Sequence, residues 1–274
     1  MTTTAATTLR FRALHASGCF VMPNPWDVGS ARLLAGLGFP ALASTSAGFA
    51  WSAGKADNRV TVDDVLAHLR AMAGAVPMPI NADFEGGFAR EPDQVAANVR
   101  AATTTGIAGL SIEDSTGNAG APLHDMALAV ERIRAARSAI DATGTGVLLT
   151  GRSEGFIAGR PDLAETIRRL GAYAEAGAEC LYAPGIRAVS DMAVVVRELA
   201  PHPVNALVYS DFATVAALAQ VGVRRISIGG ALARVAYTAM VNAAREIAEL
   251  GTFTGLATAV PRIDFDEAFS ADRP

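Results

Sequence analysis

The sequence predicts one α/β domain over residues 1–274, folded as a (β/α)8 TIM barrel with a short N-terminal helix and a C-terminal helical tail. The length suits a single closed barrel. Short β-branched or apolar runs alternate with helical patterns eight times along the chain, as βα units around a parallel sheet require. Four helix-to-strand joints carry glycine, at Gly38, Gly106, Gly177 and Gly222, which indicates one repeated architecture.

The elements follow one another in regular order. The predicted strands are Cys19–Met22, Ala41–Thr45, Ile80–Asp83, Gly109–Glu113, Gly146–Gly151, Cys180–Ala183, Val204–Val208 and Arg225–Ile228. The predicted helices are Val28–Leu37, Val62–Ala75, Pro92–Thr105, Met126–Ala142, Leu163–Ala176, Ser190–Leu199, Phe212–Gln220 and Ala231–Leu250. Residues 1–17 fit either a transit peptide or a short helix that closes the barrel through Leu9, Phe11 and Leu14. A doubly wound sheet is the alternative fold, but the glycine-rich first turn that it needs is missing.

Composition excludes several classes of protein. A formal net charge of -4 and a pI near 5.6 argue against nucleic acid or an anionic membrane as a partner. No apolar run approaches the roughly 18 residues that span a membrane. Cys19 and Cys180 sit in apolar runs and form no disulfide framework, which fits a reducing cytoplasm. Because Lys55 is the only lysine, an enzyme that depends on a lysine Schiff base is not expected.

Polar side chains gather where the third, fourth and fifth predicted strands end. Asp83 and Glu85 are two residues apart, so on an extended chain they point to the same side. Glu113 ends the fourth run and Arg152 follows the fifth, so all four side chains are expected to converge at the barrel mouth. Converging carboxylates suit Mg²⁺ with open coordination positions, and Arg152 suits a substrate carboxylate. Separate helix caps or surface ion pairs are the alternative interpretation.

Two further segments offer backbone donors. After the second strand, Thr45, Ser46 and Ala47 can hold a carboxylate or an enolate oxygen, although a Ser/Thr turn explains them equally. After the eighth strand, residues 227–230 read SIGG, at the position where many barrels bind phosphate on free amides. Close packing of helix on strand is the alternative reason for these glycines.

In combination these motifs resemble the isocitrate lyase and phosphoenolpyruvate mutase superfamily, over nearly the whole barrel. The first turn, NPWD at 24–27 followed by SAR at 30–32, is similar to the first turn of that family. TSAG at 45–48 resembles its substrate-binding segment, and DFEGGF at 83–88 resembles its Asp-x-Asp-x-Gly-Tyr metal motif. IED at 112–114 is similar to its Glu-Asp pair, and GRSE at 151–154 to its Ala-Arg-x-Asp/Glu segment.

The resemblance implies a role for each of these residues. Asp83 would bind Mg²⁺ directly, with Mn²⁺ as the alternative ion, and Glu85 and Glu113 would hold the metal or its waters. Arg152 would stabilise the substrate, and Asp57 matches an aspartate on the loop after the family's second strand. Arg152, Asp57 and Glu113 are therefore the expected catalytic residues. The expected substrate-binding residues are Trp26, Thr45, Ser46, Ala47 and Arg152, with Asn118 and His124 as loop contacts.

Family members form homotetramers or dimers of dimers that swap the last barrel helix. The helical pattern Ala231–Leu250, with the tail through Phe269, fits a homo-oligomer of that kind, a dimer or a tetramer. One departure concerns the loop after the fourth strand. Isocitrate and methylisocitrate lyases carry Lys-Lys-Cys-Gly-His there, whereas residues 114–124 of this chain contain no cysteine and no lysine. Isocitrate lyase activity is therefore not expected.

The functional hypothesis that follows is a cytoplasmic Mg²⁺-dependent lyase. It would cleave a C–C bond of a small 2-oxo or 2-hydroxy (di)carboxylic acid through a metal-bound pyruvyl enolate. P–C bond chemistry of the phosphoenolpyruvate mutase or phosphonopyruvate hydrolase type is one alternative, with Asp57 near the phosphoryl group. A non-catalytic barrel that binds 2-oxo acids is the other.

Overall fold

The computed structural model describes residues 3–259 and 264–270 and confirms the predicted (β/α)8 barrel. Eight parallel strands lie in the order β1-β8-β7-β6-β5-β4-β3-β2. A backbone hydrogen bond of 3.0 Å from the Ala43 amide to the Pro23 carbonyl links the chain near β1 and β2, so the ring nearly closes. The strands are β1 Phe20–Met22, β2 Leu42–Ala43, β3 Ile80–Asp83, β4 Gly109–Glu113, β5 Leu148–Arg152, β6 Cys180–Tyr182, β7 Val204–Leu207 and β8 Arg225–Ser227.

Helices surround the strands, and each of the eight predicted helical patterns has a counterpart. The helices are α1 Thr3–Leu14, α2 Val28–Gly36, α3 Ser46–Ser52, α4 Val62–Ala75, α5 Pro92–Thr103, α6 Met126–Thr143, α7 Leu163–Glu175, α8 Val189–Glu198, α9 Val215–Gln220, α10 Ala231–Leu250, the 3-10 helix η1 Thr254–Ala259, and α11 Phe265–Ser270. Of these, α3 is not among the predicted elements. The predicted domain boundaries, 1–274, extend beyond the described residues.

Side-chain caps explain where the observed elements differ from the predicted ones. Thr45 does not extend the second strand, because its Oγ1 accepts a hydrogen bond of 3.3 Å from the Gly48 amide and so begins α3. Thr214 likewise accepts from the Ala217 amide at 3.1 Å, and α9 begins after it rather than at Phe212. The predicted order of strands and helices is confirmed, but these two caps shorten the second strand and delay the start of α9.

The four joint glycines adopt the conformation that their position predicts. Gly38, Gly106, Gly177 and Gly222 have φ of 82, 94, 105 and 89°, in the left-handed region that other residues rarely enter. The chain can therefore leave a helix and enter the next strand within four or five residues.

The N-terminal helix α1 closes the barrel at the end where the strands begin. Phe11 of α1 is fully buried, and its ring meets those of His15 and Phe20 edge-on at 4.7 and 6.4 Å between centres. Leu9 is exposed, so of the residues expected to close the barrel Phe11 has the main role. The larger apolar core lies between the strands and the surrounding helices.

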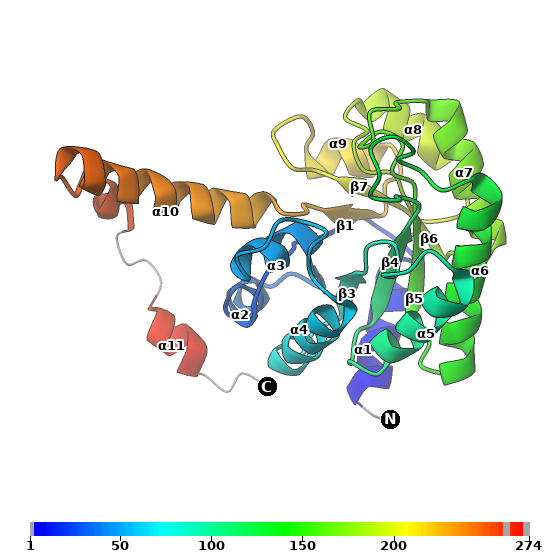
Figure 1. Cartoon of the computed structure of the whole chain (residues 1–274), viewed down its shortest axis with the longest axis horizontal. Helices are drawn as coiled ribbons and strands as arrows, with labels where there is room; N and C mark the ends of the chain where they lie inside the picture. The colour runs from blue at the N-terminus through cyan, green and yellow to red at the C-terminus, as the bar shows by residue number, and fades with distance from the viewer. Residues whose placement is uncertain (1–2, 260–263, 271–274) are drawn as a thin grey trace.

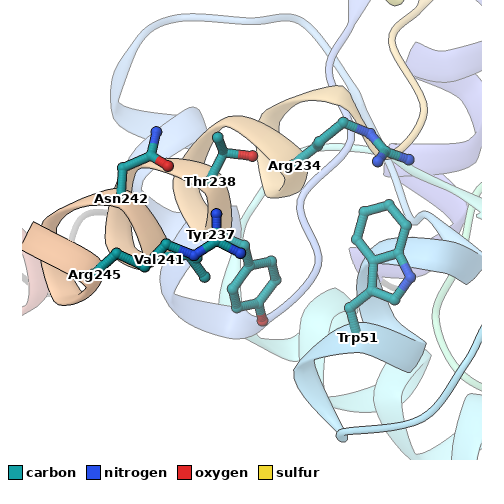
Figure 2. A pocket seen from close by; sticks show the side chains of 7 residues that line it. All are labelled: Trp51, Arg234, Tyr237, Thr238, Val241, Asn242 and Arg245. Atoms are coloured by element: carbon teal, nitrogen blue, oxygen red, sulfur yellow. The ribbon is translucent and has the colours of Figure 1, made fainter. Parts of the chain in front are cut away.

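Helix α10 leaves the barrel instead of covering it. Only Ala233 of its 20 residues is buried, and the helix projects away from the strands (Figure 1). A groove of about 490 Å³ runs between its first turns and Trp51 of α3, where the Arg234 guanidinium lies 4.9 Å from the Trp51 ring centre (Figure 2). Farther along, Arg32 of α2 donates to the Phe269 carbonyl of α11 at 3.2 Å. Within the described part of the chain, no helix is both long and apolar enough to cross a membrane.

Replacing Gly109 by alanine should destabilise the fold by about 1–3 kcal/mol, because the added methyl overpacks the barrel interior. A Cβ at this position would lie 2.6 Å from the Phe11 ring and 2.7 Å from Asn81 Oδ1. Gly74→Ala is the matched control: nothing lies within 4 Å, and alanine in this helical position should stabilise by about 0.5–1 kcal/mol. Urea unfolding measures both changes. A stable Gly109→Ala protein would show that α1 does not fill the barrel as described.

Candidate active site

Three residues that the sequence predicted to converge do meet at the carboxyl ends of adjacent strands. Asp83 ends β3, Glu113 ends β4 and Arg152 ends β5. One terminal nitrogen of Arg152 lies 3.1 Å from Asp83 Oδ1 and 3.3 Å from Glu113 Oε2. Separate caps or surface ion pairs are therefore not what these residues form. The guanidinium bridges two carboxylates at the barrel mouth.

Arg152 has two further partners that the sequence did not reveal. Its Nε donates to the Glu154 carboxylate, and its guanidinium carbon lies 5.2 Å from the centre of the Tyr182 ring. Burial alone would lower the pKa of Arg152, but the carboxylates of Glu154, Glu113 and Asp83 outweigh it and raise that pKa well above its ordinary value. Arg152 is therefore a permanent cation, buried and fixed in direction.

The carboxylic acids around Arg152 have raised pKa values. Burial, opposed by Arg152 and reinforced by Glu154 and Asp83, raises the pKa of Glu113 well above its usual range. Burial and the nearby carboxylates of Asp83 and Asp57 raise the pKa of Glu85 to about 7. Desolvation and Asp83 also raise the pKa of Asp57. In each case burial is the largest cause, and repulsion between neighbouring carboxylates adds to it.

Glu85 corrects one step of the sequence argument. The chain does not remain extended after Asp83: it turns, and Glu85 has a φ of 46° in the left-handed region. Asp83 and Glu85 therefore do not share a face of one strand. Asp83 lines a cavity of about 170 Å³ inside the barrel mouth, whereas Glu85 lines an adjacent cavity of about 660 Å³.

The segment after β2 positions Asp83. The Ser46 amide donates to Asp83 Oδ2 at 2.9 Å, and the Asp83 amide donates to Ser44 Oγ at 2.8 Å. The predicted substrate donor at Ser46 thus already serves the carboxylate. Thr45, Ser46, Ala47 and Asp57 all line the 170 Å³ cavity beside Asp83 and Arg152. The structure therefore brings this predicted group together around one small space.

The remaining predicted substrate contacts lie elsewhere. Asn118 and His124 line the 660 Å³ cavity with Glu85 and Glu113. Burial, and then the charges of Arg132 and Arg90, lower the pKa of His124, so its ring is neutral near pH 7. Trp26 lines neither cavity; its ring lies 6.4 Å from the ring centre of Tyr237 on α10.

The loop between β4 and α6 is short and held to itself. Ser115 and Leu123 form an isolated antiparallel β-bridge. The Thr116 amide donates to the Pro122 carbonyl at 2.9 Å, and the His124 amide donates to the Asp114 carbonyl at 2.8 Å. Asp114, at its base, is almost fully buried. Its carboxylate accepts from Tyr173, Arg169 and the Glu154 amide at 2.6, 3.2 and 2.8 Å. Asp114 therefore links the end of β4, which carries Glu113, to the end of β5, which carries Arg152.

Arg132 is a positioning residue that the sequence did not single out. It is 1% exposed and donates to the backbone carbonyls of Glu113 (2.9 Å), Ala89 (3.1 Å) and Gly86. It thereby fixes the turn that carries Glu85 against the end of β4. A signal was present, because Arg132 falls on the apolar stripe of α6 with Ala129, Ile133 and Ala136.

The glycines after β8 do not form a phosphate site of free amides. Asn24 Oδ1 accepts from the amides of Ile228 and Gly229 at 2.9 and 3.0 Å. Asn24 Nδ2 donates to the Ser44 carbonyl at 2.8 Å. The side chain therefore ties the first turn of the barrel to its second and eighth strands.

The donor chemistry fits a divalent cation, although the acids are not gathered as a ready-made cage. Among the described residues, no three His, Cys, Asp or Glu side chains form a group that could hold a metal ion as they stand. Arg152 lies between the carboxylates instead. However, Glu85 Oε1 is buried without a hydrogen-bond partner, and Asp83, Glu85 and Glu113 offer only the oxygen ligands that Mg²⁺ prefers. An added cation would relieve the excess negative charge around them.

Comparison with known proteins gives a consistent picture. A model of the phosphoenolpyruvate phosphomutase family matches residues 11–248. An uncharacterized protein of Mycobacterium tuberculosis is 32% identical over 243 residues, covering 88% of this chain and 90% of its own. A crystal structure from Burkholderia cenocepacia J2315, provisionally assigned as a lyase/mutase, is 45% identical with a TM-score of 0.95 and 98% coverage of both chains. The structure of 2,3-dimethylmalate lyase, a PEP mutase/isocitrate lyase superfamily member, is 29% identical with a TM-score of 0.81, covering 95% of this chain and 90% of its own.

The raised pKa of Glu85, about 7, predicts how the metal-free protein responds to pH. The folded state holds this proton more tightly than the unfolded chain, so the stabilisation is present below the ordinary pKa and is lost as pH rises through about 7. In chelator, Glu85→Gln should therefore raise the free energy of unfolding at pH 8 by about 1–2 kcal/mol, a value reduced for partial exposure. At pH 5 the variant and the natural protein should be alike. Equal effects at both pH values in urea titrations would contradict this assignment.

Proposed function

The chain belongs to the phosphoenolpyruvate phosphomutase family, and from that premise we propose that it is a Mg²⁺-dependent lyase that cleaves a C–C bond of a small 2-oxo or 2-hydroxy (di)carboxylic acid. The observation that carries this proposal is the Arg152 guanidinium bridging Asp83 and Glu113 beside a small polar cavity. A permanent cation and a set of carboxylates at one point suit a substrate that is itself an anion and chelates a metal.

Asp83, Glu85 and Glu113 are the residues that would hold the metal, with Mn²⁺ as the alternative ion. Bound there, a divalent cation supplies Lewis-acid polarisation of the substrate's oxygen atoms. Asp83 is already oriented by the Ser46 amide and Ser44, and Glu85 is fixed by the turn that Arg132 holds. The protein therefore offers individually held oxygen ligands at the ends of β3 and β4 and in the turn after β3, and a metal would have to draw them together.

Arg152 would bind and orient the acid. Its Nε and one terminal nitrogen already bond the site carboxylates, so the other terminal nitrogen would pair with a substrate carboxylate, and the charge of the guanidinium opposes the negative charge that develops on the 2-oxo oxygen during cleavage. The cavity of about 170 Å³ is smaller than the roughly 300–1,000 Å³ of sites for drug-sized ligands, which favours an acid of few carbon atoms.

The loop over the site limits the choice of reaction. Residues 114–124 contain no cysteine or lysine, so they provide neither a thiol nor an ammonium as proton donor. Decarboxylation and retro-aldol cleavage require little from such a loop, because the electrons of the broken bond move onto the adjacent carbonyl. Oxaloacetate-like and methylmalate-like acids are the candidate substrates.

P–C bond chemistry is the second candidate, and one observation favours it. Asp57 lines the same cavity as Asp83 and Arg152, although it is exposed at the surface of the loop after α3. A carboxylate there could position water or a phosphoryl group opposite Arg152. Phosphate release from phosphonopyruvate would identify this chemistry.

We also propose that α10 pairs with a second copy of the chain. Its exposed apolar residues Val235, Met240 and Leu250, and the groove beside Trp51, would be covered by the corresponding helix of another subunit (Figure 2). In a (β/α)8 barrel the helix after the last strand normally packs on that barrel. Helix α10 follows β8 but leaves its residues other than Ala233 unburied, which supports packing on a second copy. The expected assembly is a homodimer or homotetramer.

The thiols agree with a cytoplasmic location, which remains a proposal. Cys19 and Cys180 are both free in the structure. Cys180 is fully buried, and burial raises the pKa of its thiol, so it is an inert core residue rather than a nucleophile.

Asp83→Ala should abolish both Mg²⁺ binding and turnover, because it removes the carboxylate that is held toward the cavity. The assay incubates the protein with Mg²⁺ and a panel of acids, including oxaloacetate, 2-methylmalate and phosphonopyruvate, and measures pyruvate and phosphate. Asp93→Ala, an exposed acid in the first turn of α5, is the control and should retain both properties.

Two outcomes of the same panel would contradict the proposed lyase. Full activity of Asp83→Ala in chelator would exclude the metal site. Tight binding of oxalate with no product from any acid would instead identify a non-catalytic binding barrel.

A charged substitution on α10 tests the assembly. Val241→Glu, in the groove beside Trp51, should shift the protein toward monomer in sedimentation velocity, because the glutamate would be buried in the shared face. Ala71→Glu, at an exposed position of α4, should leave the mass unchanged. An unaltered mass in the α10 variant would show that this helix is not the interface.

A further inference from the structure

A second guanidinium lies inside the barrel, and it has no acidic partner. Arg225 begins β8 and is 1% exposed. Its Nε donates to Asn205 Oδ1 at 2.9 Å, and its terminal nitrogens contact Thr150 Oγ1 at 3.1 Å and His15 Nε2 at 3.3 Å. All three partners are neutral groups. Within residues 3–259 and 264–270, no carboxylate forms an ion pair with this side chain.

The surrounding titratable groups do not supply the missing negative charge. His15 Nδ1 contacts the Phe11 carbonyl at 2.8 Å as a donor, which leaves Nε2 as the acceptor for Arg225. Burial and the Arg225 charge lower the pKa of His15 to about 3, so the ring is neutral. Burial raises the pKa of the Cys180 thiol despite the nearby Arg225. Arg225 is thus a buried cation without a counter-ion, an arrangement that is costly unless an anion arrives.

Arg225 lies one layer below the residues that form the site. Thr150, which it contacts, precedes Arg152 by two residues on β5. Asn81 likewise precedes Asp83 by two residues on β3, and side chains two apart on a strand share a face. Both Arg225 and Asn81 line the 170 Å³ cavity that Asp83 and Arg152 also line. The cavity therefore runs from the proposed metal site down to a positively charged floor.

The floor has unused hydrogen-bonding capacity. A guanidinium carries five N–H groups, and Arg225 uses three, which leaves one on each terminal nitrogen. Asn81 is 4% exposed, and its Oδ1 is buried without a hydrogen-bond partner. Rotation of this amide would break the 3.3 Å hydrogen bond from Nδ2 to the Ala82 carbonyl and present the two N–H groups in place of Oδ1. The three existing bonds hold Arg225 in place, so the floor is preorganised for an anion.

We propose that Arg225, with Asn81, forms an anion subsite that binds the second carboxylate of the substrate. The inference rests on the proposed function, in which the first carboxylate and the 2-oxo or 2-hydroxy group are held at Arg152 and the metal. Two cations at the two ends of a small cavity fit a short dicarboxylate. Arg225 is then a specificity-determining residue, because a monocarboxylate leaves its charge unpaired.

Malate and lactate test the subsite directly, since both are 2-hydroxy acids and only malate has a second carboxylate. Isothermal titration of the Mg²⁺-loaded protein should show malate binding about tenfold or more tighter than lactate, as a charge-assisted hydrogen-bonded pair implies. Arg225→Met should weaken malate binding by that factor and leave lactate binding unchanged. Arg224→Met is the matched control, because Arg224 bonds the Gly18 carbonyl and lines neither cavity.

A second variant covers the case in which Arg225→Met does not fold. Arg225→Lys keeps the charge but not the two-pronged geometry, so it should bind malate more weakly than the natural protein with lactate unchanged. Equal affinities for malate and lactate in the natural protein, or an unaltered ratio in the Arg225 variants, would overturn the subsite. Loss of the ratio in the variants, with no turnover of any acid by the natural protein, would support the subsite while removing the lyase.

Discussion

The mouth of this barrel depends on the charge of Arg152. Its guanidinium meets Asp83, Glu113 and Glu154, which come from β3, β4 and the end of β5. Without that cation the buried carboxylates would repel one another, and burial would favour their protonated forms. The pKa values of Glu113, Glu85 and Asp57 nevertheless remain raised, mainly by burial and then by neighbouring carboxylates. A cation bound beside these groups would favour their charged forms.

The barrel itself was predictable because its signals are local and repeated. Alternating apolar runs, helical periods and joint glycines each depend on short-range physics, and all eight strands were found. Sequence periodicity could not show element boundaries that depend on one side-chain hydrogen bond. Thr45 could continue a strand or cap a helix, and the hydrogen bond to the Gly48 amide decides for α3. The course of α10 could not be derived from periodicity either, since an amphipathic helix reads alike whether it covers its own barrel or another.

The structure tests the predicted geometry of the candidate site, and it confirms part of it. Strand ends placed Asp83, Glu113 and Arg152 correctly, because adjacent parallel strands bring their carboxyl ends together. The extended-chain argument failed at Glu85, where the backbone turns. Trp26 was placed by resemblance alone; its ring lies 6.4 Å from that of Tyr237 and lines neither cavity, and its role stays a prediction. Arg132 was missed, and Asp114 was named in the Glu-Asp pair without a role, because both act on backbone groups and neighbouring loops, which motifs of site residues do not describe.

The N-terminal helix has a consequence that reaches beyond folding. Through Phe11 it fills the space under Gly109, and through His15 it contacts Arg225, so the first helix supports a residue that lines the 170 Å³ cavity without lining that cavity itself. A segment with the composition of a cleavable leader is thus an internal part of the catalytic domain. Proteolytic trimming within it would open the base of the barrel and release Arg225 from one of its three anchors.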